Sequence, residues 1–249
     1  MSDHSFKPIG VIRSCFTEKF GIPRQAGLVP QARAILEILP EFRRREAFRG
    51  LEEFSHIWLL FVFHANAGQP WKATVRPPRL GGNRRVGVFA SRSGFRPNRI
   101  GQSVAALSKV EAGNQKLALH LGGIDLLDGT PVLDIKPYLP YADSLPDAAC
   151  GYADGKPEPS LPVTFSDQAL QTCRVLERQQ PGLENLIRDL IALDPRPAYH
   201  ENRPQRGSYG MRLWDWNVRF CVTGSHALVE GIDIPAPAES QNDDGFDSL

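Results

Sequence analysis

Short apolar segments that follow one another without a long helix between them constrain the fold of this chain most strongly. Proline, glycine and polar turn residues separate these strand-length segments. They lie at residues 6–14, 54–64, 101–110, 116–121 and 124–138. Parallel strands need a long crossover connection, whereas antiparallel strands can be joined by a turn. The sequence therefore predicts a mainly β fold, an antiparallel barrel or sandwich.

The clearest strand is residues 54–64 (FSHIWLLFVFH), because the segment is short, aromatic and aliphatic. His56 and His64 have the same parity and would face the same side of it, where a structural, hydrogen-bonded role is the simplest expectation. Residues 32–39 are ambiguous between strand and helix. In residues 124–138, Asp128-Gly129 lies between two apolar runs and predicts a tight turn.

The second part of the chain has a different pattern. Residues 143–162 are rich in Pro, Gly, Ala and Asp and predict a connection. A helix is expected from the N-cap Ser166, a second over residues 183–193, and then a hairpin of residues 212–223 and 227–234 around Gly224-Ser225. We therefore predict a barrel domain (1–150), a small α+β helix-hairpin domain (163–236) and an acidic, disordered tail (237–249).

Positive charge is concentrated in one region. The chain has 29 Lys and Arg against 28 Asp and Glu, yet no acidic residue interrupts the basic ones between residues 72 and 101. These basic residues are Lys72, Arg76, Arg79, Arg84, Arg85, Arg92, Arg96 and Arg99. Such a stretch indicates a polyanion-binding surface, most commonly for nucleic acid. A solvated basic face is the alternative.

Residues 86–101 (VGVFASRSGFRPNRIG) combine a strand-like start with a polar loop. Val, Phe and Ala at residues 86–90 predict a short buried strand. The loop that follows carries Arg92, Arg96 and Arg99, whose planar guanidinium groups suit a carboxylate or phosphate. The sequence predicts an anion site here, with a solvated turn as the alternative.

Several classes of protein are disfavoured. The longest apolar run, residues 57–63, is too short to cross a bilayer, and the N-terminus lacks a signal-peptide apolar region. We therefore expect a soluble, cytoplasmic protein. The four cysteines are scattered, with no CxxC pair, which favours reduced structural thiols and no metal site. No GxGxxG follows a strand, so a Rossmann nucleotide site is not supported.

Five motifs together resemble the TsaA/TrmO family of tRNA methyltransferases. They are FGIPRQAGL, VRPPRLGGN, VGVFASRSGFRPNRIG, LLDGTPVLDIKPYLPYADSLPDA and DPRPAY. The resemblance implies a single-sheet β-barrel that binds S-adenosylmethionine, and a homodimer. It also implies N6-methylation of the N6-threonylcarbamoyladenosine just 3′ of the anticodon in threonine tRNAs.

The resemblance also implies which residues contact the methyl donor. Carried onto the matching positions, these contacts are Pro23, Arg24, Gln25, His64, Ala65, Arg92, Gln102, Leu127, Asp128, Gly129, Thr130 and Pro131. The family tends to have an apolar residue at Gln102, so a main-chain contact is expected there. Carbonyl oxygens of residues 127–131 would suit a cationic sulfonium.

Methyl transfer requires donor and acceptor in line, and a modest base could take the N6 proton. Asp134, Lys136 and Tyr138 follow the turn and are candidates for base or substrate anchor, against the alternative of ordinary strand-end residues. Phe95, Tyr138 and Tyr141 could stack on a splayed base.

Two other functions stay open from the residues alone. One is a non-catalytic RNA-binding module, and the other is a phosphate-handling hydrolase, which would want a metal and clustered carboxylates.

Overall fold

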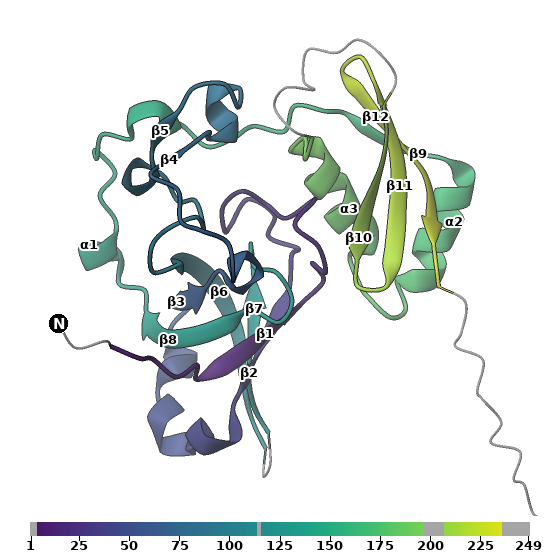
Figure 1. Cartoon of the computed structure of the whole chain (residues 1–249). Helices are drawn as coiled ribbons and strands as arrows, with labels where there is room; N and C mark the ends of the chain where they lie inside the picture. The colour runs from purple at the N-terminus through teal and green to yellow at the C-terminus, as the bar shows by residue number, and fades with distance from the viewer. Residues whose placement is uncertain (1–3, 114–115, 197–206, 236–249) are drawn as a thin grey trace, which may run out of the picture.

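The computed structural model describes residues 4–113, 116–196 and 207–235 (Figure 1). Six strands form a closed barrel in the order β1-β2-β7-β6-β3-β8, and every neighbouring pair is antiparallel. They are β1 (Gly10–Ser14), β2 (Ala34–Ile38), β3 (His56–Val62), β6 (Ile100–Ala112), β7 (Leu117–Gly122) and β8 (Pro131–Pro137). The predicted antiparallel barrel is thereby confirmed.

The barrel interior follows from period-two alternation along its strands. In β3, Ile57, Leu59 and Phe61 are buried inside, whereas Trp58 and Leu60 face outward and are only partly covered. The ambiguous segment 32–39 forms β2 for the same reason: alternate residues of β2 enter the core, and the pairing with β1 and β7 satisfies its backbone.

Two expectations about the barrel need correction. His64 lies beyond β3, in the short 3₁₀ turn His64–Asn66, so His56 and His64 do not share a strand face. The apolar run before Asp128 forms no strand. Its residues Ile124 and Leu126 are buried in the core, but the backbone of this segment is irregular. The predicted turn itself is confirmed, with Gly129 at φ 75°.

A long excursion, residues 63–99, leaves the barrel between β3 and β6. Within it β4 (Thr74–Val75) and β5 (Val86–Gly87) form a two-stranded sheet, followed by the 3₁₀ turn Val88–Ala90. The predicted buried strand at residues 86–90 is therefore only partly correct, because the strand ends at Gly87 and only Val88 of the segment is buried. β5 pairs with β4 in a sheet separate from the barrel, and Phe89 is 74% exposed. Further 3₁₀ turns between β2 and β3 are Pro40–Phe42, Arg45–Phe48 and Leu51–Glu53.

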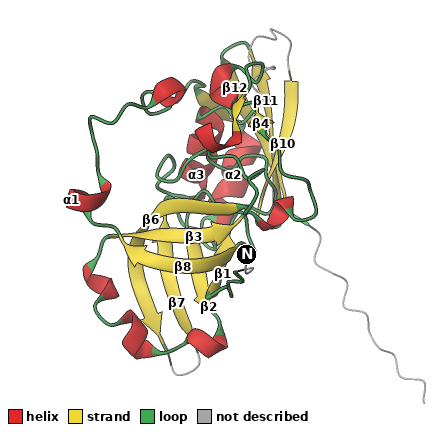
Figure 2. Ribbon diagram, turned by 60° about the vertical axis from the view of Figure 1, so that its left-hand side comes forward, coloured by secondary structure: helices red, strands yellow, loops and turns green. Residues whose placement is uncertain are grey.

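The C-terminal part builds a second sheet, in the order β10-β11-β12-β9, next to two helices (Figure 2). Its elements are β9 (Val163–Phe165), α2 (Asp167–Leu176), α3 (Leu183–Ala192), β10 (Gly207–Leu213), β11 (Trp216–Thr223) and β12 (His226–Asp233). Both predicted helices are confirmed, and Ser166 Oγ accepts the N-cap hydrogen bond from Ala169 N at 3.1 Å. The connection carries α1 (Pro140–Asp143) and the 3₁₀ turn Gly151–Ala153.

The predicted hairpin is only partly correct. Residues 212–223 are not one strand, because the chain turns at Trp214, which has a positive φ of 52°, so that β10 and β11 pair with each other. β9, which pairs in parallel with β12, was not predicted. The predicted tail, 237–249, lies outside the described residues. No helix in the described part of the chain has the length and apolar character needed to cross a membrane.

Candidate functional site

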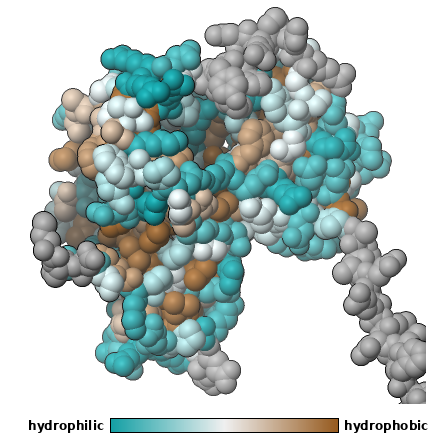
Figure 3. Space-filling model, in the orientation of Figure 1, coloured by the Kyte–Doolittle hydropathy of each residue, from teal (hydrophilic) through white to brown (hydrophobic). Residues whose placement is uncertain are grey.

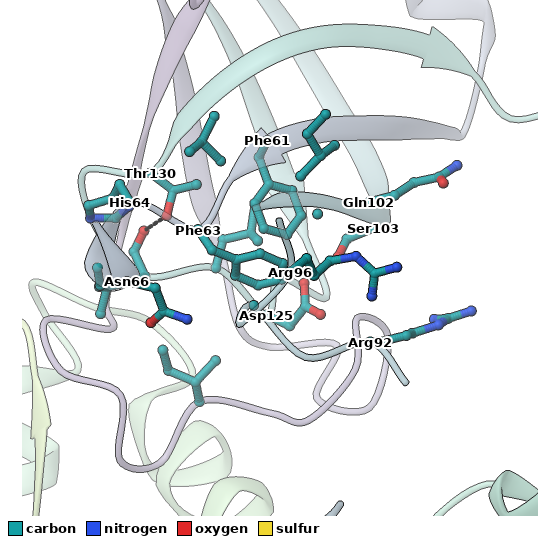
Figure 4. A pocket seen from close by; sticks show the side chains of 18 of the residues that line it. Phe61, Phe63, His64, Asn66, Arg92, Arg96, Gln102, Ser103, Asp125 and Thr130 are labelled. Carbon is teal, nitrogen blue, oxygen red and sulfur yellow. Dashed lines mark hydrogen bonds between the residues drawn. The ribbon is translucent and has the colours of Figure 1, made fainter. Parts of the chain in front are cut away.

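A cavity of about 590 Å³ lies at one end of the barrel, where β3 ends and β6 begins (Figure 4). This volume is typical of small-molecule sites. Four separate stretches of the chain supply its walls, within residues 19–25, 58–66, 91–103 and 125–130. The site therefore exists only once the barrel has closed and the loops have packed onto its end.

Two glycines let aromatic rings form the floor of this pocket. A Cβ on Gly101 would lie 2.3 Å from the ring of Phe61, and one on Gly94 would lie 2.7 Å from the ring of Phe63. Both distances are too short for real atoms, so any larger side chain would displace a ring. The two rings meet edge to face with centroids 5.1 Å apart. They give the pocket an apolar surface suited to a planar or cationic group.

Asp125 is a pocket residue that the sequence analysis missed. Its carboxylate accepts hydrogen bonds from the Ser103 hydroxyl and from the backbone N–H of Ala26, while Oδ1 is buried without a partner among the described residues. Burial raises the pKa of this carboxyl above its ordinary value, although these hydrogen bonds and the charge of Arg92 oppose the rise. Figure 4 shows Asp125 near Phe63 and Ser103, inside the pocket.

No sequence motif marked Asp125, because it lies in an apolar run that looks like a core strand. The signal that was present is a single carboxylate within the apolar run 124–127. A charged residue at such a position is rarely fully buried without a partner.

Two side-chain hydrogen bonds hold the 127–131 turn, one within the turn and one to β1. Thr130 Oγ1 donates to Leu127 O at 2.6 Å, and Asp128 Oδ1 accepts from Ser14 N at 2.9 Å. Asp128 thus binds the end of β1. Leu127 and Thr130 line the pocket, whereas Asp128, Gly129 and Pro131 are not part of its lining.

The loop 19–25 closes another side of the pocket. Pro23, Arg24 and Gln25 all line it. Gln25 Oε1 accepts from Arg92 Nη1 at 2.5 Å, joining this loop to the excursion. Lys19 Nζ donates to Asn66 Oδ1 at 2.6 Å, joining the loop to the turn that follows β3.

The three arginines of residues 86–101 do not form one anion site, which corrects that prediction. Arg92 and Arg96 line the pocket, but Arg99 does not. Arg96 donates to Ser91 O at 2.8 Å and Arg99 donates to Gln69 O, so both guanidinium groups hold loop carbonyls. Arg92, which is exposed and bonded to Gln25, remains the best placed for an anionic group.

His64 and Gln102 lie at opposite ends of the pocket in Figure 4. His64 and Ala65 enter from the turn after β3, with His64 beside Thr130. Gln102 is exposed on β6, at the rim. Nine of the predicted donor contacts therefore line one cavity. They are Pro23, Arg24, Gln25, His64, Ala65, Arg92, Gln102, Leu127 and Thr130.

Asp134 and Lys136 lie on β8 and Tyr138 directly follows it, and all three are outside the pocket lining. Strand pairing places Asp134 beside Leu60 and Lys136 beside Trp58, two residues that do line the pocket. Asp134 and Lys136 form an ion pair at 3.4 Å, and the ring of Tyr138 lies 5.8 Å from that of Trp58. The three candidates therefore occupy the outer face of the barrel, next to the pocket.

The proposed stacking residues are divided in the same way. Phe95 lines the pocket, with Lys72 Nζ 3.9 Å from its ring centroid, whereas Tyr141 is 87% exposed on α1. In the part of the chain that the structure describes, no three His, Cys, Asp or Glu side chains are grouped as a metal site would require.

The fold is shared with solved structures over nearly the whole chain. A crystal structure of TrmO from Pseudomonas aeruginosa superimposes with a TM-score of 0.78 at 46% identity, covering 94% of this chain and 99% of that one. The arrangement of barrel and C-terminal sheet is thus that of TrmO.

Sequence comparison agrees. Models of the tRNA-methyltransferase O N-terminal domain and the TrmO C-terminal domain match residues 11–144 and 158–234. The chain is 49% identical over 223 residues to the tRNA (adenine(37)-N6)-methyltransferase of Escherichia coli, covering 90% of this chain and 95% of that protein. It is 54% identical over 218 residues to a putative S-adenosylmethionine-dependent methyltransferase, RcsF, of P. aeruginosa, covering 87% and 92%. The chain therefore belongs to the TrmO family, which confirms the resemblance.

Proposed function

We propose that this chain is an S-adenosylmethionine-dependent tRNA (adenine(37)-N6)-methyltransferase whose acceptor is N6-threonylcarbamoyladenosine in threonine tRNAs. The observation that carries the proposal is a pocket that collects residues from four distant stretches, in a chain of the TrmO family. Relatives bearing the tRNA (adenine(37)-N6)-methyltransferase and S-adenosylmethionine-dependent names support the reaction and the donor.

The chemistry of the pocket fits this donor, which supplies an activated methyl group on a sulfonium. The partnerless, buried Oδ1 of Asp125 is an acceptor suited to an ammonium or another N–H group. The guanidinium of Arg92 suits a carboxylate, and the rings of Phe61 and Phe63 suit an adenine or a cation. We propose that the predicted contacts from the PRQ segment, His64 to Ala65, Gln102 and the 127–131 turn complete this binding set.

Within the turn, Leu127 O already accepts from the Thr130 hydroxyl. Thr130 therefore fixes the orientation of this carbonyl dipole beside the pocket. Asp128 and Gly129 would act through the shape of the turn, since Asp128 is bonded to Ser14.

The acceptor base is proposed to approach over the outer face of β3 and β8. Asp134, Lys136 and Tyr138 lie there, beside Trp58 and Leu60 of the pocket. The carbamoyl group acidifies the N6 proton, so a carboxylate such as Asp134 suffices as its acceptor, with Lys136 or Tyr138 anchoring the substrate. Splayed anticodon-loop bases are commonly received on aromatic faces, which Trp58 and Tyr138 offer.

The excursion provides the surface for tRNA phosphates. Lys72, Arg76, Arg84 and Arg85 are exposed on it. Figure 3 shows this hydrophilic region above an apolar patch on the face of the barrel that carries β3 and β8. Substituting Arg84 and Arg85 by Ala should weaken tRNA binding and reduce its salt dependence by about one unit of slope per lost phosphate contact.

A homodimer is part of the proposal. Towards β6, the outer face of the barrel carries the partly exposed Leu60 and Val62 of β3 and Ile100 of β6, which is 39% exposed, whereas the acceptor base approaches over Trp58 and Tyr138 on the β8 side. Apolar residues gathered on one face favour an interface. The pocket extends onto this face, so a second copy could complete its wall. Sedimentation of the wild type against Leu60→Asp would test this assembly, and a monomeric wild type would contradict it.

We further propose the domain limits 1–150 and 163–236, supported by the separate sheets, and a cytoplasmic location, supported by the tRNA acceptor.

Calorimetric titration with S-adenosylmethionine, and separately with ATP, tests the proposed function. Binding of the sulfonium compound alone, followed by methyl transfer to threonylcarbamoylated but not to unmodified threonine tRNA, is the expected result. Binding of neither compound, with retained tRNA affinity, would indicate a non-catalytic RNA-binding module. Preference for ATP would indicate a phosphate-handling enzyme.

A further inference from the structure

The C-terminal domain lies directly behind the loop that closes the methyl-donor pocket. This contact begins in the main chain, where Trp214 N donates to Cys15 O at 2.7 Å and Phe16 pairs with Leu213 as an antiparallel bridge. Next to this bridge, the backbone N–H of Arg212, the residue before Leu213, donates to Glu18 Oε1 at 3.0 Å. The end of β10 therefore continues the hydrogen bonding of the chain that leaves β1.

Side chains extend the contact along the loop. The ring of Phe20 stacks on Tyr209 and Phe220, with centroids 6.4 Å away in each case and an interplanar angle of 14°. Gly21 has a φ of +88°, and a Cβ there would lie 2.3 Å from Met211 Sδ. The loop thus lies so close to the C-terminal sheet that only glycine fits.

The far end of the loop is held as well. Arg24 Nη2 donates to Arg196 O at 3.5 Å. The Arg196 side chain is buried and forms two 2.7 Å hydrogen bonds to Asp194, which raise the pKa of its guanidinium. The carbonyl that Arg24 meets therefore belongs to a braced segment of the C-terminal domain.

The opposite side of the same loop forms the pocket wall. Lys19, Ile22, Pro23, Arg24 and Gln25 all line the cavity. Phe20 and Gly21 lie between Lys19 and Ile22 in the sequence and pack on the C-terminal sheet instead. A displacement of the backbone at Phe20 would therefore also move Ile22, two residues on, and Gln25, five residues on, in the pocket wall.

We propose that the C-terminal domain positions residues 19–25 and thereby sets the affinity of the pocket for the methyl donor, with Phe20 and Met211 as positioning residues. This inference rests on the proposed function. Small shifts of groups that touch a ligand reduce binding or rate strongly even when their cause is remote. By linkage, the donor must in turn stabilise the contact between loop and domain.

The test compares Phe20→Leu and Met211→Ala with a matched control, Ile187→Ala, in the full chain. Ile187 is fully buried in α3 and does not belong to residues 19–25 or to the pocket lining. Affinity for S-adenosylmethionine is measured by calorimetry without RNA, at a temperature where each variant is folded. We expect a loss of roughly tenfold or more in the two positioning variants. Phe20→Tyr, which keeps the stacked ring, should retain wild-type affinity, and so should the destabilised control.

A second measurement separates positioning from general stability. Amide hydrogen exchange in β10 of the wild type should slow when the donor binds, although β10 does not line the pocket. This protection should be reduced in Met211→Ala. Wild-type affinity in a folded Phe20→Leu, or an equal loss in Ile187→Ala, would overturn the inference. Absence of donor binding by the wild type would instead reject the proposed function.

Discussion

The pocket has two kinds of wall, and they are built in different ways. The barrel wall includes Phe61 of β3 and Ser103 of β6, two strands that are paired on both edges, and Asp125 from the segment next to them. The loop wall, residues 19–25 and 91–96, is held by side-chain hydrogen bonds to carbonyls and by the C-terminal sheet. Ladder hydrogen bonds fix the first wall cooperatively, whereas the second depends on a few separate contacts.

The two walls also differ in chemistry. The barrel wall offers aromatic rings and one buried carboxylate, whose desolvation requires a closely packed surrounding. The loop wall offers guanidinium and amide groups, which keep access to water. The difference suggests that the rigid wall determines which ligand fits, while the loop wall contributes charge and closes over it.

The largest effect is expected on the barrel wall. Asp125→Asn keeps the shape but removes the charge, and a hydrogen bond to a charged group contributes about 1.5–3 kcal/mol, or roughly ten- to hundredfold in affinity. Calorimetry with S-adenosylmethionine should show this loss. The variant should also be at least as stable to urea as the wild type, because a buried charge is removed. Unchanged donor affinity would exclude Asp125 from recognition.

A smaller loss is expected on the loop wall for Arg92→Ala. If Arg92 holds the carboxylate of the donor, affinity should fall about tenfold, less than for Asp125→Asn, since the group is exposed and screened. Arg84→Ala removes an exposed guanidinium from the same excursion without touching the pocket lining and serves as the matched control. Full donor affinity in Arg92→Ala, together with weaker tRNA binding, would assign this arginine to the phosphate surface.

Arg96→Ala should have a weaker and indirect effect. Arg96 holds Ser91 O and Val88 O, so its loss should loosen the excursion and reduce donor affinity about threefold, in line with one neutral-acceptor hydrogen bond. Proteolysis of the excursion should become faster in this variant. A loss as large as that in Arg92→Ala would show that Arg96 touches the ligand directly.

The smallest effect concerns the pH dependence of stability. The folded-state pKa of Asp125 lies above its ordinary value of 3.8, so protonation favours the folded state. This contribution is fully present below 3.8 and is lost as pH rises through the raised pKa. Urea unfolding of the wild type and Asp125→Asn should therefore diverge as pH rises through that window, with the wild type losing stability relative to the variant. Parallel profiles would contradict the burial of this charge.

Sequence reasoning was accurate where a local period decides the structure. The β3 and β7 segments, the Ser166 cap and the α3 helix each carry their pattern within ten residues or so. It failed at residues 88–90, which form a 3₁₀ turn instead of continuing the strand, and at Trp214. An apolar run becomes a barrel strand only if a neighbour is available, and a positive φ can divide a continuous apolar run.

The candidate site divides in the same way. Motif resemblance identified the PRQ segment, Arg92 and the 127–131 turn, and nine of the residues it implied lie around one cavity. It did not separate Arg92 from Arg99. Arg92 lines the pocket and donates to the side-chain oxygen of Gln25, whereas Arg99 lies outside the lining and donates to the backbone oxygen of Gln69. It also missed Asp125, because burial, not residue type, makes that carboxylate distinctive.

The amino-acid sequence by itself determined the strand-rich class, the two helices, the basic excursion and the TrmO family, because alternation, capping and motif order are local properties of the chain. Only the tertiary structure decided that residues from four distant stretches meet at the end of the barrel and that Asp134 lies outside that cavity. It also decided that the C-terminal sheet lies behind the loop of Phe20 and Gly21. These contacts join residues far apart in sequence, and no local pattern encodes which of them pack together.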